Sequence, residues 1–247
     1  MFSATDYDKL QQIMAESTEK KELLCRLLES HQMELRTISH EIRNPLTLVY
    51  STLQLIESQH PETASFKYWK ELREDIEYMK QLLEELSSYN NGERLEPEPV
   101  NMVTFLKTLS LSFASSLTDT NIEFTSRISP TLPVVHMDPV KMKQVLLNLL
   151  GNARDAVLMC PEKSCPAIVL DSCITDSKIQ LSISDTGCGI SREHLSTVFE
   201  PFVTHKPNGT GLGLAIAKRI IQAHQGNIFV TSEVGDGTVF TITFPIQ

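Results

Sequence analysis

The chain has 247 residues, of which 41% are hydrophobic and 21% are charged, as is usual for a folded globular protein. This length accommodates two domains of modest size, each with a hydrophobic core of its own. The formal net charge of −9 argues against nucleic acid as a partner, because nucleic acid attracts basic surfaces.

The sequence predicts no membrane segment in this chain, because it contains no run of about 18 apolar residues. Its first residues also lack the basic and apolar stretches of a secretory signal. We therefore expect a cytoplasmic location, either alone or as the soluble part of a longer or membrane-attached protein. The five cysteines include no C-x-x-C pair and are expected to be structural thiols, although zinc binding by Cys160 and Cys165 stays open.

Residues 6–89 read as helical, and Pro61 interrupts them once. The pattern predicts two long helices in an antiparallel hairpin, preceded by a further helical segment. Apolar residues recur at heptad spacing in both helices, and two copies of the hairpin are expected to bury these seams as a four-helix dimer. The seam positions are Leu28, Leu35, Ile42, Val49 and Ile56, interleaved with Ile38, Pro45 and Thr52, and in the second helix Trp69, Ile76 and Leu83 with Leu72, Met79 and Leu86.

His40 falls at heptad position f of the first helix, which faces away from the seam. A neutral imidazole exposed in this way can act as a nucleophile toward a phosphoryl group. The adjacent Glu41 is placed to orient the ring or take its proton, and Asn44 lies one turn later, where its amide can position a water. A surface histidine without a role remains the alternative at this stage. Pro45 is expected to bend the helix beside the site.

Residues 90–99 are rich in turn-forming and charged side chains and are the best candidate for a linker. The predicted domains are residues 1–90, a linker over 91–99, and residues 100–247. Beyond the linker, β-branched content and periodicity predict five strands and three helices, which implies an α+β sandwich with helices on one face of a sheet. The predicted strands are 122–127, 167–174, 178–184, 227–232 and 238–244, and the predicted helices are 100–117, 139–158 and 211–224.

Two glycine-rich segments lie in this second part, residues 185–190 after a predicted strand and residues 209–214 before a predicted helix. Such loops allow backbone N–H groups to approach phosphates, although neither segment is a P-loop. Asn148 and Asn152 lie four residues apart on one face of a helix, and their amide oxygens suit Mg²⁺ bound with phosphates. Asparagines that cap a helix or face water would give the same pattern.

In order and spacing, these segments together resemble the conserved boxes of the sensor histidine kinases, most closely the nitrogen-regulatory and sporulation-kinase branch. The resemblance covers the chain from about residue 36 to its end. The matching segments are His40–Leu46, Asn148–Ala156, Asp185–Ile190, Phe199–Phe202, Gly209–Leu214 and Gly235–Thr238.

The resemblance implies the ATP-binding fold of gyrase-type ATPases and ninety-kilodalton heat-shock chaperones. It implies that Asn152 coordinates Mg²⁺, that Asp185 accepts from the adenine amino group with support from Thr238, and that Lys206, in a lid over residues 203–208, contacts phosphate. A solvated loop lysine remains the alternative for Lys206. The full set of expected nucleotide-binding residues is Asn148, Asn152, Asp185, Gly187, Gly189, Lys206, Gly209, Thr210, Gly211, Leu212, Gly213 and Thr238.

The resemblance also implies the activity: a homodimer that uses Mg-ATP to phosphorylate His40, with Glu41 and Asn44 as catalytic neighbours. The phosphoryl group would pass to an aspartate in the receiver domain of a response regulator, and hydrolysis of that phosphoaspartate is a further activity that the family allows. Two rivals stay open: an ATP hydrolase or serine-directed kinase on the same fold, and a phosphotransfer scaffold whose ATP site is inactive.

Overall fold

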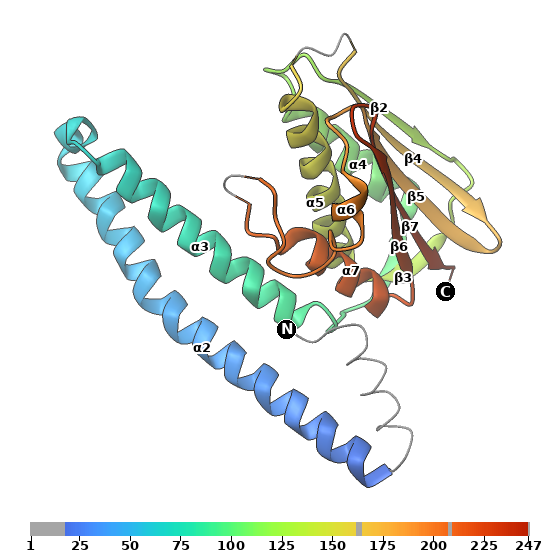
Figure 1. Ribbon diagram of the computed structural model, residues 1–247, viewed down its shortest axis with the longest axis horizontal. Coiled ribbons are helices and arrows are strands. Elements are labelled where there is room, and N and C mark those ends of the chain that lie inside the picture. Colours follow the sequence, from blue (N-terminus) through green and yellow to red (C-terminus); the bar gives the residue numbers. More distant parts are fainter. Residues whose placement is uncertain (1–17, 162–164, 207–208, 247) are drawn as a thin grey trace. The chain divides into compact units, whose positions relative to one another are not determined.

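The computed structural model describes residues 18–161, 165–206 and 209–246, with only part of the side chains in residues 18–40. The chain divides into two compact units, Met1–Asn90 and Asn91–Gln247. Each unit is built around its own secondary structure (Figure 1). None of the helices within the described ranges is long and apolar enough to cross a membrane.

The first unit is the predicted helical hairpin. Helix α2 (Thr18–Gln59) is followed by a short 3₁₀ helix, η1 (Pro61–Ser65), and by helix α3 (Trp69–Asn91) (Figure 1). Pro61 ends the first helix where the sequence predicted, because its ring leaves no backbone N–H for helix continuation. At this turn the indole Nε1 of Trp69 donates to Glu57 Oε1 over 2.8 Å, which ties the start of α3 to the end of α2.

The predicted seam is uncovered on a single hairpin. Ile76 of α3 is buried, at 4% exposed, whereas Leu72 and Met79, its neighbours in the seam of α3, are each 44% exposed. An exposed apolar stripe of this kind is unusual on a monomeric surface and indicates a partner face. The exposed members of the stripe are Ile38, Ile42, Val49, Leu72 and Met79.

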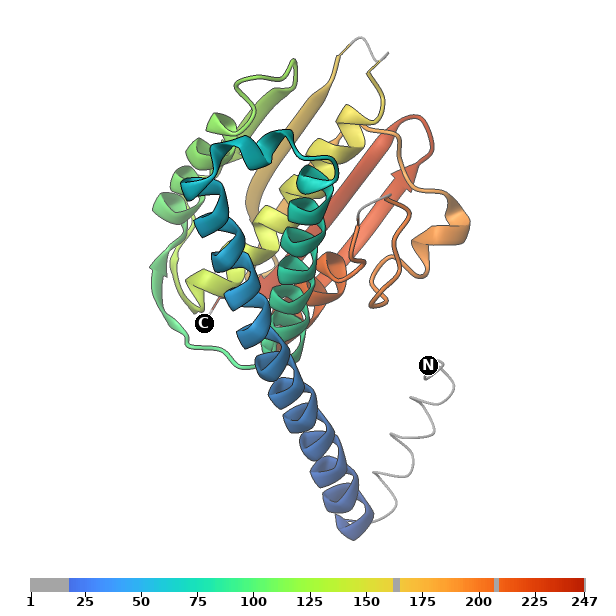
Figure 2. The same ribbon diagram turned by 90° about the vertical axis from the view of Figure 1, so that its left-hand side faces the viewer.

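The second unit is a two-layer α+β sandwich, as predicted. Its five-stranded sheet has the order β2-β4-β5-β7-β6, in which only the β2–β4 pair is parallel. Helices α4, α5 and α7 lie on one side of this sheet (Figures 1 and 2). The bounds are α4 (Met102–Ser115), β2 (Glu123–Ile128), α5 (Pro139–Leu158), β4 (Ala167–Thr175), β5 (Lys178–Asp185), α6 (Arg192–Leu195), α7 (Gly213–Ala223), β6 (Asn227–Glu233) and β7 (Gly237–Pro245).

The core lies between the helices and the sheet. Alternate residues of β4, β5 and β7 point to the helices and are buried, as the period of two in a strand requires. Each of the larger buried side chains contributes on the order of 1.5–3 kcal/mol through burial alone. Among the most completely buried are Leu146, Leu149 and Leu150 on α5, Ile216 and Ile220 on α7, and Ile168, Leu181 and Ile183 on the sheet.

The sequence missed two short strands at the start of this unit. Strand β1 (Glu98–Asn101) pairs antiparallel with β3 (Val134–Met137). The predicted helix over residues 100–117 therefore begins later, at Met102, where the side chain of Asn101 accepts from the Thr104 N–H over 3.0 Å and caps it. Four-residue strands carry too little alternation to be recognised from sequence.

The segment predicted as a linker is bonded to the second unit. Glu93 forms an ion pair with Arg219 of α7, at 2.6 Å between Oε1 and a guanidinium nitrogen. The Glu96 N–H donates to Asp138 Oδ2 over 3.0 Å, and the other oxygen of Asp138 caps α5. The Asp138 N–H in turn donates to Nε2 of buried His224. Residues 93–96 are therefore attached to the helices that carry the glycine and asparagine motifs.

Candidate functional site

Helix α5 carries the two asparagines predicted to bind a metal and phosphates. It begins at Pro139 behind its Asp138 cap, and its apolar residues fix its rotation against the sheet. The amide nitrogen of Asn148 donates to the carbonyl oxygen of Gly213 over 3.1 Å. Asn148 therefore joins α5 directly to the first residue of α7, the end of the second glycine segment.

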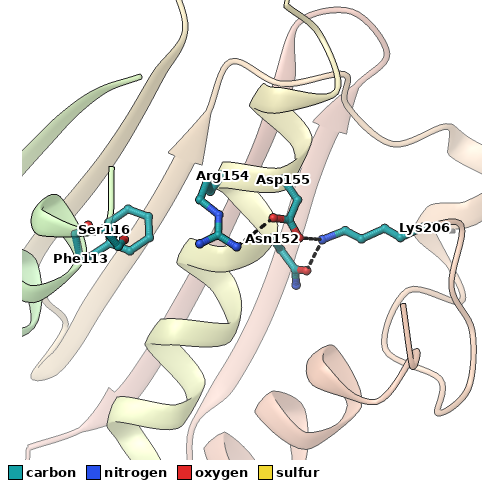
Figure 3. Close-up of polar contacts among 6 residues, drawn as sticks. All are labelled: Phe113, Ser116, Asn152, Arg154, Asp155 and Lys206. Atoms are coloured by element: carbon teal, nitrogen blue, oxygen red, sulfur yellow. Dashed lines mark hydrogen bonds and ion pairs between the residues drawn. The ribbon is translucent and has the colours of Figure 1, made fainter. Parts of the chain in front are cut away.

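Asn152 lies one turn further along α5 and takes part in a polar cluster with Arg154, Asp155 and Lys206 (Figure 3). Lys206 Nζ lies 2.8 Å from Asn152 Oδ1 and 2.8 Å from Asp155 Oδ2. Arg154 contacts the other carboxylate oxygen of Asp155 at 3.2 Å. The side chains of Arg154, Asp155 and Lys206 are each about one third exposed, so the cluster is open to solvent and to a ligand.

The first glycine segment follows β5 and lies against the last turn of α5. Asp185 is 8% exposed, and its Oδ1 accepts from the Gly187 N–H over 2.8 Å. Gly187 packs so closely on Ala156 that a Cβ there would lie 2.6 Å from its backbone and Cβ atoms. Only glycine allows this approach, which places the buried carboxylate beside the helix that carries Asn152.

Thr238 lies opposite Asp185 in the β5–β7 pairing and is 4% exposed. Its hydroxyl is 3.0 Å from that of Ser232 on β6, and the Ser232 hydroxyl accepts from the Ile190 N–H over 2.8 Å. Ser232 thus connects the first glycine segment to the terminal Gly-Thr turn. Sequence reasoning missed Ser232, because its only signal is a position in β6 that turns out to face Thr238.

The second glycine segment is held by backbone contacts. Gly211 has φ of +70° and accepts from the Phe202 N–H over 2.9 Å. A Cβ at Gly211 would lie 2.6 Å from the carbonyl carbon of Phe202. The positive φ and this close approach both favour glycine over any other residue here. Leu212 is fully buried, and its N–H donates to the Thr210 hydroxyl over 3.3 Å.

The predicted nucleotide residues thus form two groups that share α5. In the first group, Asn148 bonds to Gly213 and Asn152 bonds to Lys206, and Gly209 lies beside Thr204 and Lys206. Asp185, Gly187 and Thr238 form the second group with Gly189, and this group meets α5 at Ala156, one turn beyond Asn152. Asp155 was the site residue that sequence reasoning left without a role, although its spacing from Asn152 already placed it on the same helical face.

The donor set at Asn152 fits a hydrated magnesium ion carried by phosphates. Asn152 Oδ1 and Asp155 Oδ2 are hard oxygen ligands of the kind that Mg²⁺ takes, and both already hold a cation, the Lys206 ammonium. Lys206 and Arg154 supply positive charge for phosphate oxygens. The remainder of the predicted lid, residues 207–208, lies outside the described residues.

The predicted phosphoacceptor lies in the first unit. His40 belongs to α2, but its side chain is outside the part of the chain whose side chains the structure describes. Its neighbours Glu41 and Asn44 are exposed, which agrees with a solvent-facing surface at this turn of the helix. Arg43 points the other way and donates to the Leu83 carbonyl of α3 over 3.4 Å.

Cys188, in the middle of the first glycine segment, has a perturbed thiol. Burial raises the pKa of Cys188, and the neighbouring Cys160 thiol raises it further. Cys160 and Cys165, which the sequence left open as zinc ligands, are free cysteines. Across the described ranges, no three histidine, cysteine, aspartate or glutamate side chains gather as ligands for a metal ion.

Comparison with known proteins finds two families in chain order. Residues 30–94 match the His Kinase A (phospho-acceptor) domain, and residues 137–247 match the histidine kinase-, DNA gyrase B-, and HSP90-like ATPase family. The signal transduction histidine-protein kinase AtoS of Escherichia coli (strain K12) is 29% identical over 95% of this chain and 39% of its own length. Sporulation kinase E of Bacillus subtilis (strain 168) is 28% identical over 95% of this chain and 32% of its own.

Solved structures show the same likeness. Full-length ShkA in complex with AMPPNP matches 87% of this chain and 46% of its own, with a TM-score of 0.72 and 27% identity. The catalytic domain of the histidine kinase ThkA is 30% identical over 61% of this chain and 96% of its own, with a TM-score of 0.54. This chain spans less than two fifths of the two relatives from Escherichia coli and Bacillus subtilis.

Proposed function

The chain belongs to the sensor histidine kinases, and from this premise we propose that it transfers the γ-phosphoryl group of ATP to His40 and then to an aspartate of a response regulator. The observation that carries this proposal is the position of α5. One helix bonds to the second glycine segment through Asn148 and packs on the first through Ala156. The two ends of a nucleotide, its base and its phosphates, would therefore meet one rigid element.

Binding of ATP is supported by the two groups of residues along the C-terminal half of α5. Asp185 supplies a buried acceptor for the adenine amino group, and Thr238 lies beside it across the β5–β7 pairing. In the other group, Lys206 and the N–H groups of the second glycine segment are donors for phosphate oxygens. Mg²⁺ bound at Asn152 would neutralise charge on the phosphates and on the γ-phosphoryl group during its transfer.

The chemistry of Asn148 favours transfer over hydrolysis. The Asn148 amide nitrogen is committed to the Gly213 carbonyl, and an amide cannot take a proton from water. The site therefore orders the phosphates without providing a base for an attacking water. Such a site favours a nucleophile supplied from elsewhere, the role that we assign to His40, with Glu41 orienting the ring and taking its proton.

The exposed stripe on the hairpin supports a homodimer. Two copies that bury Ile42, Val49 and Met79 against one another would form a four-helix bundle, and the solvent-facing turn at Glu41 and Asn44 would stay accessible. That turn is then the docking face for a receiver domain. A water positioned by the Asn44 amide would hydrolyse the regulator's phosphoaspartate in the reverse activity.

Phosphorylation with ATP labelled at the γ-position tests this proposal. The wild-type protein should acquire label that is lost in acid and kept in base, as expected for phosphohistidine, and should pass it to a receiver domain. His40→Ala should acquire no label while calorimetry still records nucleotide binding, since His40 is on the first unit. Label that persists on His40→Ala would refute the acceptor assignment, and acid-stable label would favour a serine-directed kinase.

A further inference from the structure

Lys206 is held by two acceptors of different kinds. Its ammonium lies 2.8 Å from the neutral amide oxygen of Asn152 and 2.8 Å from a carboxylate oxygen of Asp155 (Figure 3). Both bonds involve the charged ammonium, but only the Asp155 carboxylate carries the opposite charge and adds a Coulomb attraction that the neutral amide lacks. Asp155 therefore supplies the greater part of the attraction that fixes the position of this lysine.

The Asp155 carboxylate is shared between two cations. Its Oδ1 contacts Arg154 at 3.2 Å, and its Oδ2 contacts Lys206 at 2.8 Å. Arg154 precedes Asp155 on the same helix, so this first contact is local and holds the carboxylate on the side of α5 from which Asn152 also projects (Figure 3). The second contact spans 51 residues and fixes a loop to the helix.

The loop around Lys206 is shaped for this contact. The Lys206 N–H donates to the Thr204 hydroxyl over 3.2 Å. The ring of His205 stacks on that of His194 in α6, with 3.6 Å between the ring centroids. These contacts set the direction of the backbone, but they leave the long side chain of Lys206 to be placed by Asn152 and Asp155.

Asn152 and Asp155 cannot both remain bonded to the Lys206 ammonium once a magnesium ion binds Asn152. Mg²⁺ demands ligands at about 2.0–2.1 Å in near-octahedral order, so a magnesium ion on Asn152 Oδ1 would repel the ammonium bound to the same atom. The Asp155 oxygen is a separate atom three residues along the helix. It can retain Lys206 after Asn152 has exchanged one cation for the other.

We propose that Asp155 is a positioning residue, which holds the Lys206 ammonium beside the phosphate site while Asn152 exchanges that ammonium for the divalent cation. The replacement of the ammonium by a divalent cation at Asn152 rests on the proposed function. The bond between Asp155 and Lys206 does not depend on it. Lys206 then reaches the γ-phosphate from a fixed position, and no free side chain has to be ordered at that moment.

Amine labelling tests the hold on Lys206 without any activity. The full chain, free of nucleotide and magnesium, is treated with a limiting amount of an acetylating ester, and the rate at each lysine is measured by peptide mass spectrometry, with Lys178 and Lys218 as internal references. Lys206 in Asp155→Asn should react about threefold faster than in the wild type, the factor that a part-exposed ion pair supports. Asp155→Glu should restore slow labelling.

Asn152→Ala is the matched control, because it removes the neutral acceptor and leaves the charged one. Labelling of Lys206 in this variant should stay close to the wild-type rate. Equal rates in the wild type and Asp155→Asn, or faster labelling in Asn152→Ala than in Asp155→Asn, would overturn the proposal.

Kinetics then separate positioning from folding. In Asp155→Asn, autophosphorylation at saturating ATP should fall severalfold and recover in Asp155→Glu, whereas calorimetric affinity for ADP should change little, because ADP lacks the γ-phosphate. An equal loss for ADP and ATP would indicate a structural role and overturn the proposal. A wild-type protein that does not phosphorylate itself would refute the proposed function, and the labelling rates would still decide whether Asp155 holds Lys206.

Discussion

The buried carboxylate of Asp185 shows how one residue can provide specificity for the adenine base in the proposed site. It is 8% exposed and shares a hydrogen bond of 2.8 Å with the Gly187 N–H, so its orientation is set before any ligand arrives. A buried acceptor that is oriented in advance favours a ligand that presents a donor to it. The residue scale is also where sequence reasoning was least complete, since it gave Asp155 and Ser232 no role.

Asp185→Asn should weaken nucleotide binding about tenfold, because asparagine keeps only one acceptor oxygen, so either the Gly187 N–H or the adenine amino group would face its NH2 group. Calorimetric titration with ADP measures this. Asp171→Asn is the control: Asp171 lies on β4 in a surface ion pair with Arg127. Unchanged affinity in Asp185→Asn would remove Asp185 from the base-binding site.

The Cys188 thiol should react slowly with iodoacetamide at neutral pH. Its pKa is raised by burial and by the Cys160 thiol, so a smaller fraction is thiolate than for an ordinary cysteine. The exposed Cys173 serves as the reference thiol, and the Cys188 rate should keep rising with pH beyond the range in which the thiol of free cysteine levels off. Mass spectrometry of the two peptides gives both profiles from one sample. Cys188 that reacts as fast as Cys173 at neutral pH would contradict this cause.

At the scale of elements, α5 is the part of the fold that the sequence predicted best. Its predicted bounds, residues 139–158, are those observed, because a capping Asp138, a proline at the first turn and a periodic apolar face all agree. The loop that follows α6 shows the opposite case. Phe202 has φ of +65° and meets the backbone of Gly211, a conformation that no local pattern announces.

Gly211→Ala should lower the stability of the second unit by about 1 kcal/mol or more, because alanine is strained at φ of +70° and would press on the Phe202 backbone. It should also weaken ATP binding. Gly151→Ala is the control and should raise stability. Gly151 lies on α5 with nothing within 4 Å of a new Cβ, and alanine is more favourable than glycine in a helix by about 1 kcal/mol. Urea unfolding of both variants gives the comparison; a neutral Gly211→Ala would contradict the strain.

At the scale of the whole molecule, the chain combines a hairpin with an uncovered apolar face and an α+β unit with a core of its own. The sequence predicted both, because heptads and strand alternation are periodic over many residues. It predicted residues 91–99 as a linker, and the structure adds the bonds of Glu93 and Glu96 to the second unit. Residues 93–96 are therefore bonded into the second unit.

Replacing both Val49 and Met79 by glutamate should convert a dimer to monomers, because charges would have to be buried in the seam. Light scattering across a range of protein concentrations measures the mass. Leu111→Glu is the control, since Leu111 is 72% exposed on α4 and lies outside the hairpin. A double variant that keeps the wild-type mass would place the dimer contact elsewhere.

The sequence by itself determined the long helices, the five strands of the main sheet, the heptad seam and the order of the motif segments, because each of these depends on neighbouring residues or on a short period. Only the tertiary structure decided that Lys206 meets Asp155, that Ser232 meets Thr238 and that Asn148 bonds to Gly213. Two of these pairs join residues more than fifty positions apart. Their geometry follows from how α5 and the loops pack on one sheet, which no local pattern of side chains encodes.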